Sequence, residues 1–213
     1  MQMVCVKAIS AIVWISMRVM VVDNGSSYLQ TLLNFLHEEE VVVFKWSSNA
    51  VLNAGSYDAV IFSGESTTSI IADEEKYEKE IALVKSLDKP ILGVCLGFEL
   101  IAYSYGAQMK HVTVREALSM DIRIVKHDPI FNHVPVLQVY GGNRWVIDSL
   151  GVFLETLGKS DEGIEIVKHK DKMMYGLQLQ PEVIVDKTIS ESIFRNFIST
   201  AKSFAFRQRE NRF

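Results

Sequence analysis

The sequence has only two cysteines, Cys5 and Cys95, among its 213 residues. Two cysteines give no disulfide framework, so we expect a protein of the reducing cytoplasm. No apolar run is long enough to cross a membrane. The net charge of −4 is mild, and no basic stripe of the kind that binds nucleic acid is present. We therefore expect neither a membrane nor a nucleic acid among its partners.

The sequence also lacks linkers, repeats and low-complexity segments, and its length suits one domain with a substantial core. Residues 1–16 are mostly apolar and carry a single charge, Lys7. A signal peptide would end at a cleavage site of small residues, and none follows Ser16 convincingly. We interpret residues 1–16 as a non-essential extension or a start-site artefact, with an added strand or helix as the alternative. Residues 17–213 are expected to form the domain.

Strands and helices are predicted to alternate over the first half of the chain. Apolar runs rich in β-branched residues predict strands at 18–22, 41–46, 59–62 and 91–94. Amphipathic segments predict helices at 26–36, at 73–87 and from residue 96 to Gly106. The alternation predicts a doubly wound α/β fold, with a mostly parallel sheet that helices cover on both faces. Ligands of such sheets bind at the carboxyl ends of the strands, where loops 63–68 and 95–97 are expected.

After Gly106 the pattern changes to short strands separated by turns. We expect these strands near 112–114, 122–125, 136–140, 164–167 and 173–179. A helix from about 190 to 206 is expected to close the domain.

The segment from Pro90 to Ala107 carries the clearest functional pattern. It contains Gly93-Val94-Cys95-Leu96-Gly97 between a predicted buried strand and a predicted helix. This is the form of a nucleophile elbow, with Cys where hydrolases have Ser. The turn places the Cys95 thiol at a helix N-terminus, where the dipole favours the thiolate, and the Leu96 N–H can point at a developing oxyanion. The alternative, Cys95 as a small buried core residue, fits the flanking strand and helix less well.

Three segments in order, Asp58–Gly64, Gly93–Gly97 and Tyr175–Glu182, resemble class I glutamine amidotransferases. The resemblance is greatest to the separate glutaminase subunit of archaeal GMP synthase, and residues 23–36 are also similar to the glutaminase component of anthranilate synthase. It implies a flavodoxin-like α/β fold that uses no cofactor or metal. In this family a Cys attacks the side-chain amide of L-glutamine, and a His-Pro-Glu motif supplies the base and the acid that orients it. The ammonia goes to an ATP-dependent synthetase, here a separate subunit.

The resemblance implies a catalytic set in which one member is replaced. Cys95 matches the nucleophile and Glu182 matches the orienting acid, but Gln180 stands at the position of the His. A carboxamide cannot carry a proton near neutral pH, so the general base is missing. The Gln that follows the nucleophile by four positions, and helps hold the substrate, is Glu99 here. The second glycine of the oxyanion loop is Glu65.

Further substrate-binding positions follow from the same resemblance. Gly64 keeps the first glycine of the oxyanion loop, and Asn143 aligns with part of a Ser-His pair that touches the α-groups of the substrate. Phe98 replaces a residue that is often polar. Glu65 and Glu99 are either solvated acids or face the pocket, where they would disfavour the α-carboxylate of glutamine and favour an amine.

These substitutions lead to two hypotheses. The first is a binding or regulatory subunit of the GMP synthase type, with impaired or lost glutaminase activity, that binds L-glutamine or a related small molecule. The alternative is an active glutaminase that supplies ammonia to a separate synthetase of the GMP synthase or anthranilate synthase type. A histidine folding over Cys95 would favour the alternative. The histidines, each expected at the surface or in a loop, are His37, His111, His127, His133 and His169.

Overall fold

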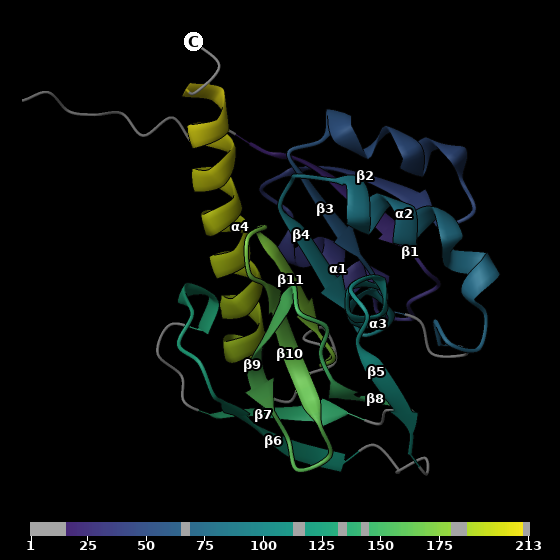
Figure 1. Cartoon of the computed structure of the whole chain (residues 1–213). Coiled ribbons are helices and arrows are strands. Elements are labelled where there is room, and N and C mark those ends of the chain that lie inside the picture. The colour runs from purple at the N-terminus through teal and green to yellow at the C-terminus, as the bar shows by residue number, and fades with distance from the viewer. Residues whose placement is uncertain are drawn as a thin grey trace, which may run out of the picture.

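The computed structural model describes residues 16–64, 69–112, 118–131, 136–141, 145–179 and 187–210, which form an eleven-stranded mixed sheet flanked by helices (Figure 1). The strands are β1 (Arg18–Asp23), β2 (Glu40–Lys45), β3 (Ala59–Phe62), β4 (Ile91–Val94), β5 (Gln108–His111), β6 (Leu118–Ile124), β7 (Val136–Gly141), β8 (Trp145–Ser149), β9 (Leu154–Lys159), β10 (Ile164–His169) and β11 (Met174–Leu177). The α-helices are α1 (Leu29–Phe35), α2 (Glu78–Ser86), α3 (Leu96–Ser104) and α4 (Lys187–Glu210). Short 3-10 helices are η1 (Asn49–Ser56), η2 (Glu74–Tyr77) and η3 (Pro129–Phe131).

The main row of the sheet has the order β2-β1-β3-β4-β11-β10-β9-β6-β7, and β5 and β8 pair beside it. Neighbouring strands from β2 to β11 run parallel, whereas the pairs from β11 to β7 run antiparallel. Helices cover both faces of the parallel half. The expected α/β fold is therefore confirmed, with an antiparallel extension on the side where short strands were expected.

Side chains of the parallel strands alternate between two cores. Val19 and Val21 of β1 belong to the core that includes residues of α1 and α4, whereas Met20 and Val22 belong to the core shared with α2 and α3. All four side chains are fully buried. Burial on both faces explains why these strands form continuous apolar runs in the sequence, without alternating polar residues.

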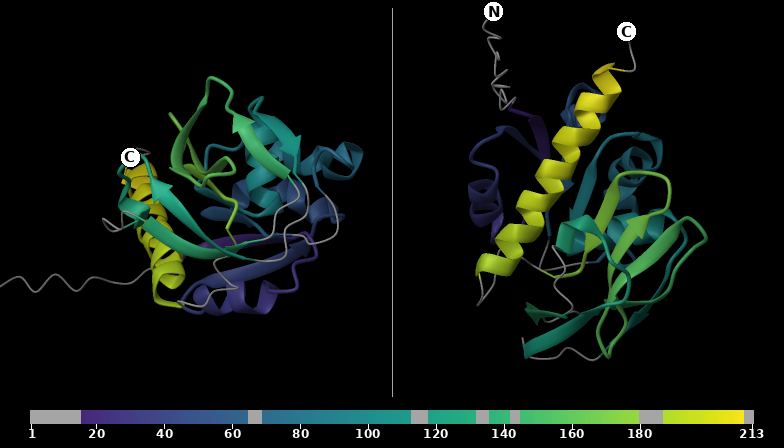
Figure 2. Two further views of the ribbon diagram at one scale, coloured as in Figure 1. Left: turned by 90° about the horizontal axis from the view of Figure 1, so that it is seen from below. Right: turned by 90° about the vertical axis from the view of Figure 1, so that its left-hand side faces the viewer.

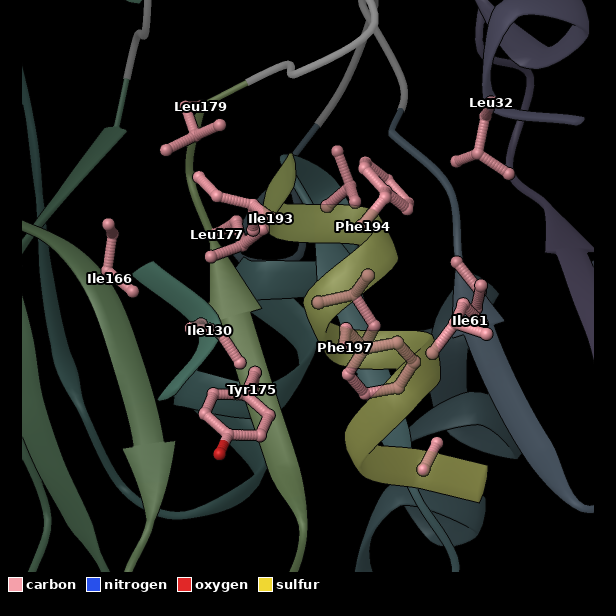
Figure 3. Close-up of a cluster of buried hydrophobic side chains, with 14 of the residues drawn as sticks. Leu32, Ile61, Ile130, Ile166, Tyr175, Leu177, Leu179, Ile193, Phe194 and Phe197 are labelled. Carbon is pink, nitrogen blue, oxygen red and sulfur yellow. The ribbon is translucent and has the colours of Figure 1, made fainter. Parts of the chain in front are cut away.

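Helix α4 covers one face of the sheet along most of its length (Figure 2). Figure 3 shows its Phe194 and Phe197 pointing toward the strands, near Ile61 of β3 and Tyr175 of β11. The rings of Tyr175 and Phe197 meet edge to face, with centroids 6.3 Å apart. The helix therefore joins the centre of the sheet to the strand that precedes the Gln180 segment. None of the described helices is both long enough and apolar enough to span a bilayer.

The sequence predictions are less accurate after α3. The strand expected at 112–114 lies earlier, as β5, and residues 113–117 lie outside the described ranges. Strands β8 and β9 were not expected. The pairing of β9 with β10 contains register shifts, which interrupt the alternation of buried and exposed side chains that would have revealed a strand. The helix expected at 73–87 is divided into η2 and α2.

A tight turn between β10 and β11 is held by a histidine side chain. His169 is 4% exposed, and its Nδ1 accepts the backbone N–H groups of Asp171 at 3.0 Å and Lys172 at 3.1 Å. Its ring also packs against Tyr105 and Phe153. Burial, and secondarily the positive charge of Lys172, lower the pKa of His169. The expectation that this histidine lies at the surface was therefore wrong, because the neutral ring satisfies two buried donors.

We expect His169 to stabilise the fold fully above about pH 6.5, the ordinary pKa of the unfolded side chain, and to lose this effect as the pH falls below it. Protonated Nδ1 cannot accept the two N–H groups. His169→Asn keeps an acceptor there without a titrating group, so the difference in unfolding free energy between the two proteins should shrink on acidification. Urea unfolding across this range measures it, and a difference independent of pH would contradict the prediction.

Candidate functional site

The strand, turn and helix expected around Cys95 are present. Strand β4 ends at Val94, α3 begins at Leu96, and Cys95 between them has φ 52° and ψ −105°. Cys95 is the one residue other than glycine with positive φ in the described parts of the chain. Such a conformation costs about 1–3 kcal/mol and persists only where the surroundings enforce it. The half-buried thiol thus stands at the N-terminus of a nine-residue helix.

Close backbone packing enforces this turn. A Cβ atom on Gly93 would lie 2.2 Å from the carbonyl oxygen of Gly97, and one on Gly97 would lie 2.5 Å from that of Phe62. Side chains at these positions would separate β3, β4 and α3. Gly64, just after β3, is so close that its Cβ would lie 3.1 Å from Cβ and 3.7 Å from Sγ of Cys95. The end of β3 therefore forms one wall beside the thiol.

Strand β11 brings a third segment to the same place. The Cys95 N–H donates to the carbonyl oxygen of Leu177 at 2.8 Å, and Leu177 is in register with Val94. Leu179, the last described residue before the Gln180 segment, follows at this edge and is buried. The carboxyl ends of β3, β4 and β11 thus meet around the thiol, where parallel sheets bind ligands.

Four predicted site residues lie outside the described residues. They are Glu65, Asn143, Gln180 and Glu182. Their assigned roles stay predictions. Of the predicted site residues, the structure places Gly64, Cys95, Leu96 and Glu99 together on the end of β3, the turn and the first turn of α3.

Glu99 is not a solvated acid. It is 6% exposed, and its Oε2 accepts the backbone N–H of Ile70 at 3.2 Å. Burial raises the pKa of Glu99 to about 7, although the bond from Ile70 acts in the opposite direction. Glu99 therefore fastens the end of the loop that leaves β3 to the helix that begins just after Cys95.

Phe98, the residue before Glu99, belongs to the core. It is fully buried, and a Cβ on Gly176 would come within 2.9 Å of its ring. Its side chain therefore packs on β11 beneath the helix. The expectation that Phe98 changes the substrate pocket is not supported by this placement, because a large ring is what fills the space over a glycine.

Two buried polar groups near this edge were not found from the sequence. Asn24, just after β1, donates its N–H to Oγ of Ser63 at 2.9 Å and its Nδ2 to the Ser63 carbonyl at 3.2 Å. Gln178, just after β11, donates its N–H to the carbonyl of Glu165 at 2.8 Å. The side-chain oxygens of Asn24 and Gln178 are buried without a hydrogen-bond partner among the described residues. Their positions directly after buried apolar runs were the signal that could have identified them.

The described histidines do not provide a base at the Cys95 turn. His37 follows α1 and lies with Asp58 at the amino ends of the strands, as does His169 in the turn before β11. The ring of His111 packs against Trp145, with centroids 5.1 Å apart. His127 is exposed after β6, and His133 lies outside the described residues. Within the described ranges, no three His, Cys, Asp or Glu side chains gather as metal ligands do.

The fold and the Cys95 turn define a class of protein that comparison with known families identifies. The family described as glutamine amidotransferase class-I matches residues 20–200. The chain belongs to the class I glutamine amidotransferase family.

Among individual proteins, the chain is similar to one of the subunits of glutamine-hydrolyzing GMP synthases. It is 29% identical to that of Methanobrevibacter smithii over 87% of this chain and 97% of the relative. It is 28% identical to that of Methanosphaera stadtmanae, over 88% and 100%. It is 25% identical to the GMP synthase of Spiroplasma kunkelii over 85% of this chain, but spans only 35% of that protein. A crystal structure from Thermoplasma acidophilum, assigned to the same GMP synthase subunit, matches with TM-score 0.82 and 22% identity over 92% and 98%, which supports the fold.

The glycine contacts predict a large cost for the smallest side chain. Gly97→Ala should lower the unfolding free energy by about 1–3 kcal/mol, because its Cβ would press on the Phe62 carbonyl. Gly55→Ala is the matched control, since Gly55 is exposed and a Cβ there would have no atom within 4 Å, and it should change stability by less than about 0.5–1 kcal/mol. Urea unfolding measures both. Equal effects would show that α3 can shift away from β3.

Proposed function

We propose that this chain is a glutamine amidotransferase subunit of the GMP synthase type that binds glutamine or a related small molecule and has impaired or lost glutaminase activity. The observation that carries the proposal is the Cys95 turn. Its positive φ, its place before α3 and the contact with Gly64 are those of a nucleophile elbow, while Gln180 occupies the sequence position of the family's His. The elbow is retained, and the proton carrier is replaced.

Glutamine hydrolysis requires a proton to move twice. The Cys95 sulfur attacks the amide carbon, and the developing oxyanion can receive the N–H of Leu96 at the helix N-terminus. The thiol proton must be accepted and then delivered to the nitrogen that leaves as ammonia. A Gln180 carboxamide can do neither. Without an imidazolium nearby, chiefly the dipole of α3 is left to favour the thiolate.

A separate ATP-dependent synthetase is the partner that we propose. The similarity to proteins that are themselves called subunits supports this, because each spans nearly the same length as this chain. The role of the chain would be to bind to that synthetase and to regulate it through the ligand at the Cys95 site. The low number of cysteines supports a cytoplasmic location.

We expect ammonia release from glutamine to be at least ~10³-fold slower than in a family member that has the His, which corresponds to about 4 kcal/mol of barrier. Gln180→His alone should restore little, because Glu65 and Glu99 still alter the substrate pocket. The assay compares the unmodified chain, Cys95→Ala and Gln180→His, each with and without a synthetase. Turnover by the unmodified chain of about 10 per second that Cys95→Ala abolishes would overturn the proposal.

One observation favours the alternative of an active glutaminase. Glu99 lies one helical turn after Cys95, and its pKa of about 7 is the value that suits a general base at neutral pH. In that case Glu99, rather than a histidine, would carry the proton. The two hypotheses predict opposite effects of one substitution, Glu99→Gln, which restores the family's residue.

If the chain is a binding subunit, Glu99→Gln should tighten glutamine binding, because it removes a negative charge near the substrate α-carboxylate. The gain should be larger above about pH 7, where Glu99 is ionised, than below it. Calorimetric titration of glutamine at both pH values measures this, with Glu165→Gln as a control for another buried acid whose pKa is raised to about 7. If Glu99→Gln instead abolishes Cys95-dependent turnover, the chain is an active glutaminase.

A further inference from the structure

A groove of about 1060 Å³ lies at the amino ends of the parallel strands, opposite the Cys95 turn. Its walls are the residues before β1, the turn between α1 and β2, and the C-terminal half of α4. Pockets for small molecules usually have volumes of about 300–1,000 Å³, so this groove is large enough for a segment of chain. We call it the amino-end groove. Its lining includes Ser16, Phe35, Glu38, Asp58, Ile198 and Phe206.

Apolar side chains form a continuous part of this lining. Phe35 and Ile198 are partly or mostly buried, and Phe206, two turns further along α4, is 56% exposed. Helix α4 extends past the strands toward its C-terminal end, as Figure 2 shows. An exposed aromatic ring that continues a buried apolar surface along a helix is typical of a face that another segment covers.

The chain enters the groove at a fixed point. The N–H of Met17 donates to Oε2 of Glu39 at 2.8 Å, and the carbonyl of Met17 accepts the N–H of Glu40 at 2.9 Å. The Glu39 side chain is only 3% exposed and is also paired with Lys202 of α4. Ser16, the residue before this anchor, is itself part of the groove wall.

We propose that residues 4–15 bind in the amino-end groove of the same chain. Their sequence, VCVKAISAIVWI, is apolar apart from Lys7 and Ser10. The segment is joined directly to the wall at Ser16, so its effective concentration at the groove is on the order of millimolar. The extension of residues 1–16 is then part of the folded domain, which goes beyond the proposed function and does not depend on it.

Length and charge fit this occupant. The twelve residues would span about 18 Å as a helix, which equals the rise of α4 between Arg195 and Arg207, and an extended chain would reach further. Lys7, the one charged side chain of the segment, would meet the acidic rim that Glu38 and Asp58 contribute. An apolar segment covering Phe206 would also remove it from water.

Trp14 lies within the segment and reports on its binding. The difference between the fluorescence of the full chain and that of Trp14→Phe isolates its signal. We expect Trp14 to be quenched by acrylamide several-fold less than a solvent-exposed tryptophan. Phe206→Glu should make it fully accessible, because the charge lies in the groove on an exposed position that the fold does not need. Val152→Glu, on a residue 77% exposed outside the groove lining, is the matched control and should change nothing.

A second measurement does not depend on these substitutions. Hydrogen exchange of the α4 amides at 203–207 should be at least ~10-fold faster in a chain that begins at Met17 than in the full chain, since the segment would no longer cover the end of the helix. Unchanged exchange together with an exposed Trp14 in the full chain would overturn the proposal.

Two other occupants are distinguishable. If Trp14 is protected only at concentrations where sedimentation detects a dimer, the segment binds a second copy and the proposal is wrong. If Trp14 is exposed in buffer and protected only by vesicles of phosphatidylcholine and phosphatidylglycerol, the segment binds membranes, which also overturns it. Protection that is independent of protein concentration and of vesicles supports binding within one chain.

Discussion

The close approach of β3, β4 and α3 determines the rest of the candidate site. Because the backbone of Gly97 rests against the Phe62 carbonyl, the chain must turn within one residue, and Cys95 takes a positive φ. The same contact brings Gly64 against the thiol. This geometry is a property of backbone packing, and it needs no proton carrier to persist. A chain can therefore keep a nucleophile elbow after the residue that makes it catalytic has been replaced, which is the situation that Cys95 and Gln180 indicate.

Buried acids make the region around this turn sensitive to pH. Burial raises the pKa of both Glu99 and Glu165 to about 7. Each contributes stability below about pH 4.5, the ordinary value for an exposed glutamate, and that contribution is lost as the pH rises through 7. Ionised Glu99 keeps a hydrogen bond from Ile70, which limits the cost. The substitution of Gln by Glu therefore changes the charge near a ligand with only a partial loss of stability.

The sequence was sufficient for the features that backbone sterics and burial on two faces determine. The parallel strands were predicted because both faces are buried, and the Cys95 turn because only glycine tolerates its contacts. It was insufficient where a side chain's direction decides. Phe98 follows Cys95 closely but points beneath α3 onto Gly176, and His169 is polar yet buried because it caps a turn. Strand β9 escaped prediction because a register shift breaks its alternation.

Helix α4 has one part in each functional region of the molecule. Its Phe194 and Phe197 pack in the core that also contains Leu177 and Leu179, the residues that lead to Gln180 (Figure 3). Its C-terminal half forms the wall of the amino-end groove. The two parts are separated by two to three helical turns, and the first is fixed by buried aromatic rings. Covering Phe206 therefore stabilises the end of the helix locally, while the position of β11 beside Cys95 depends on the core alone.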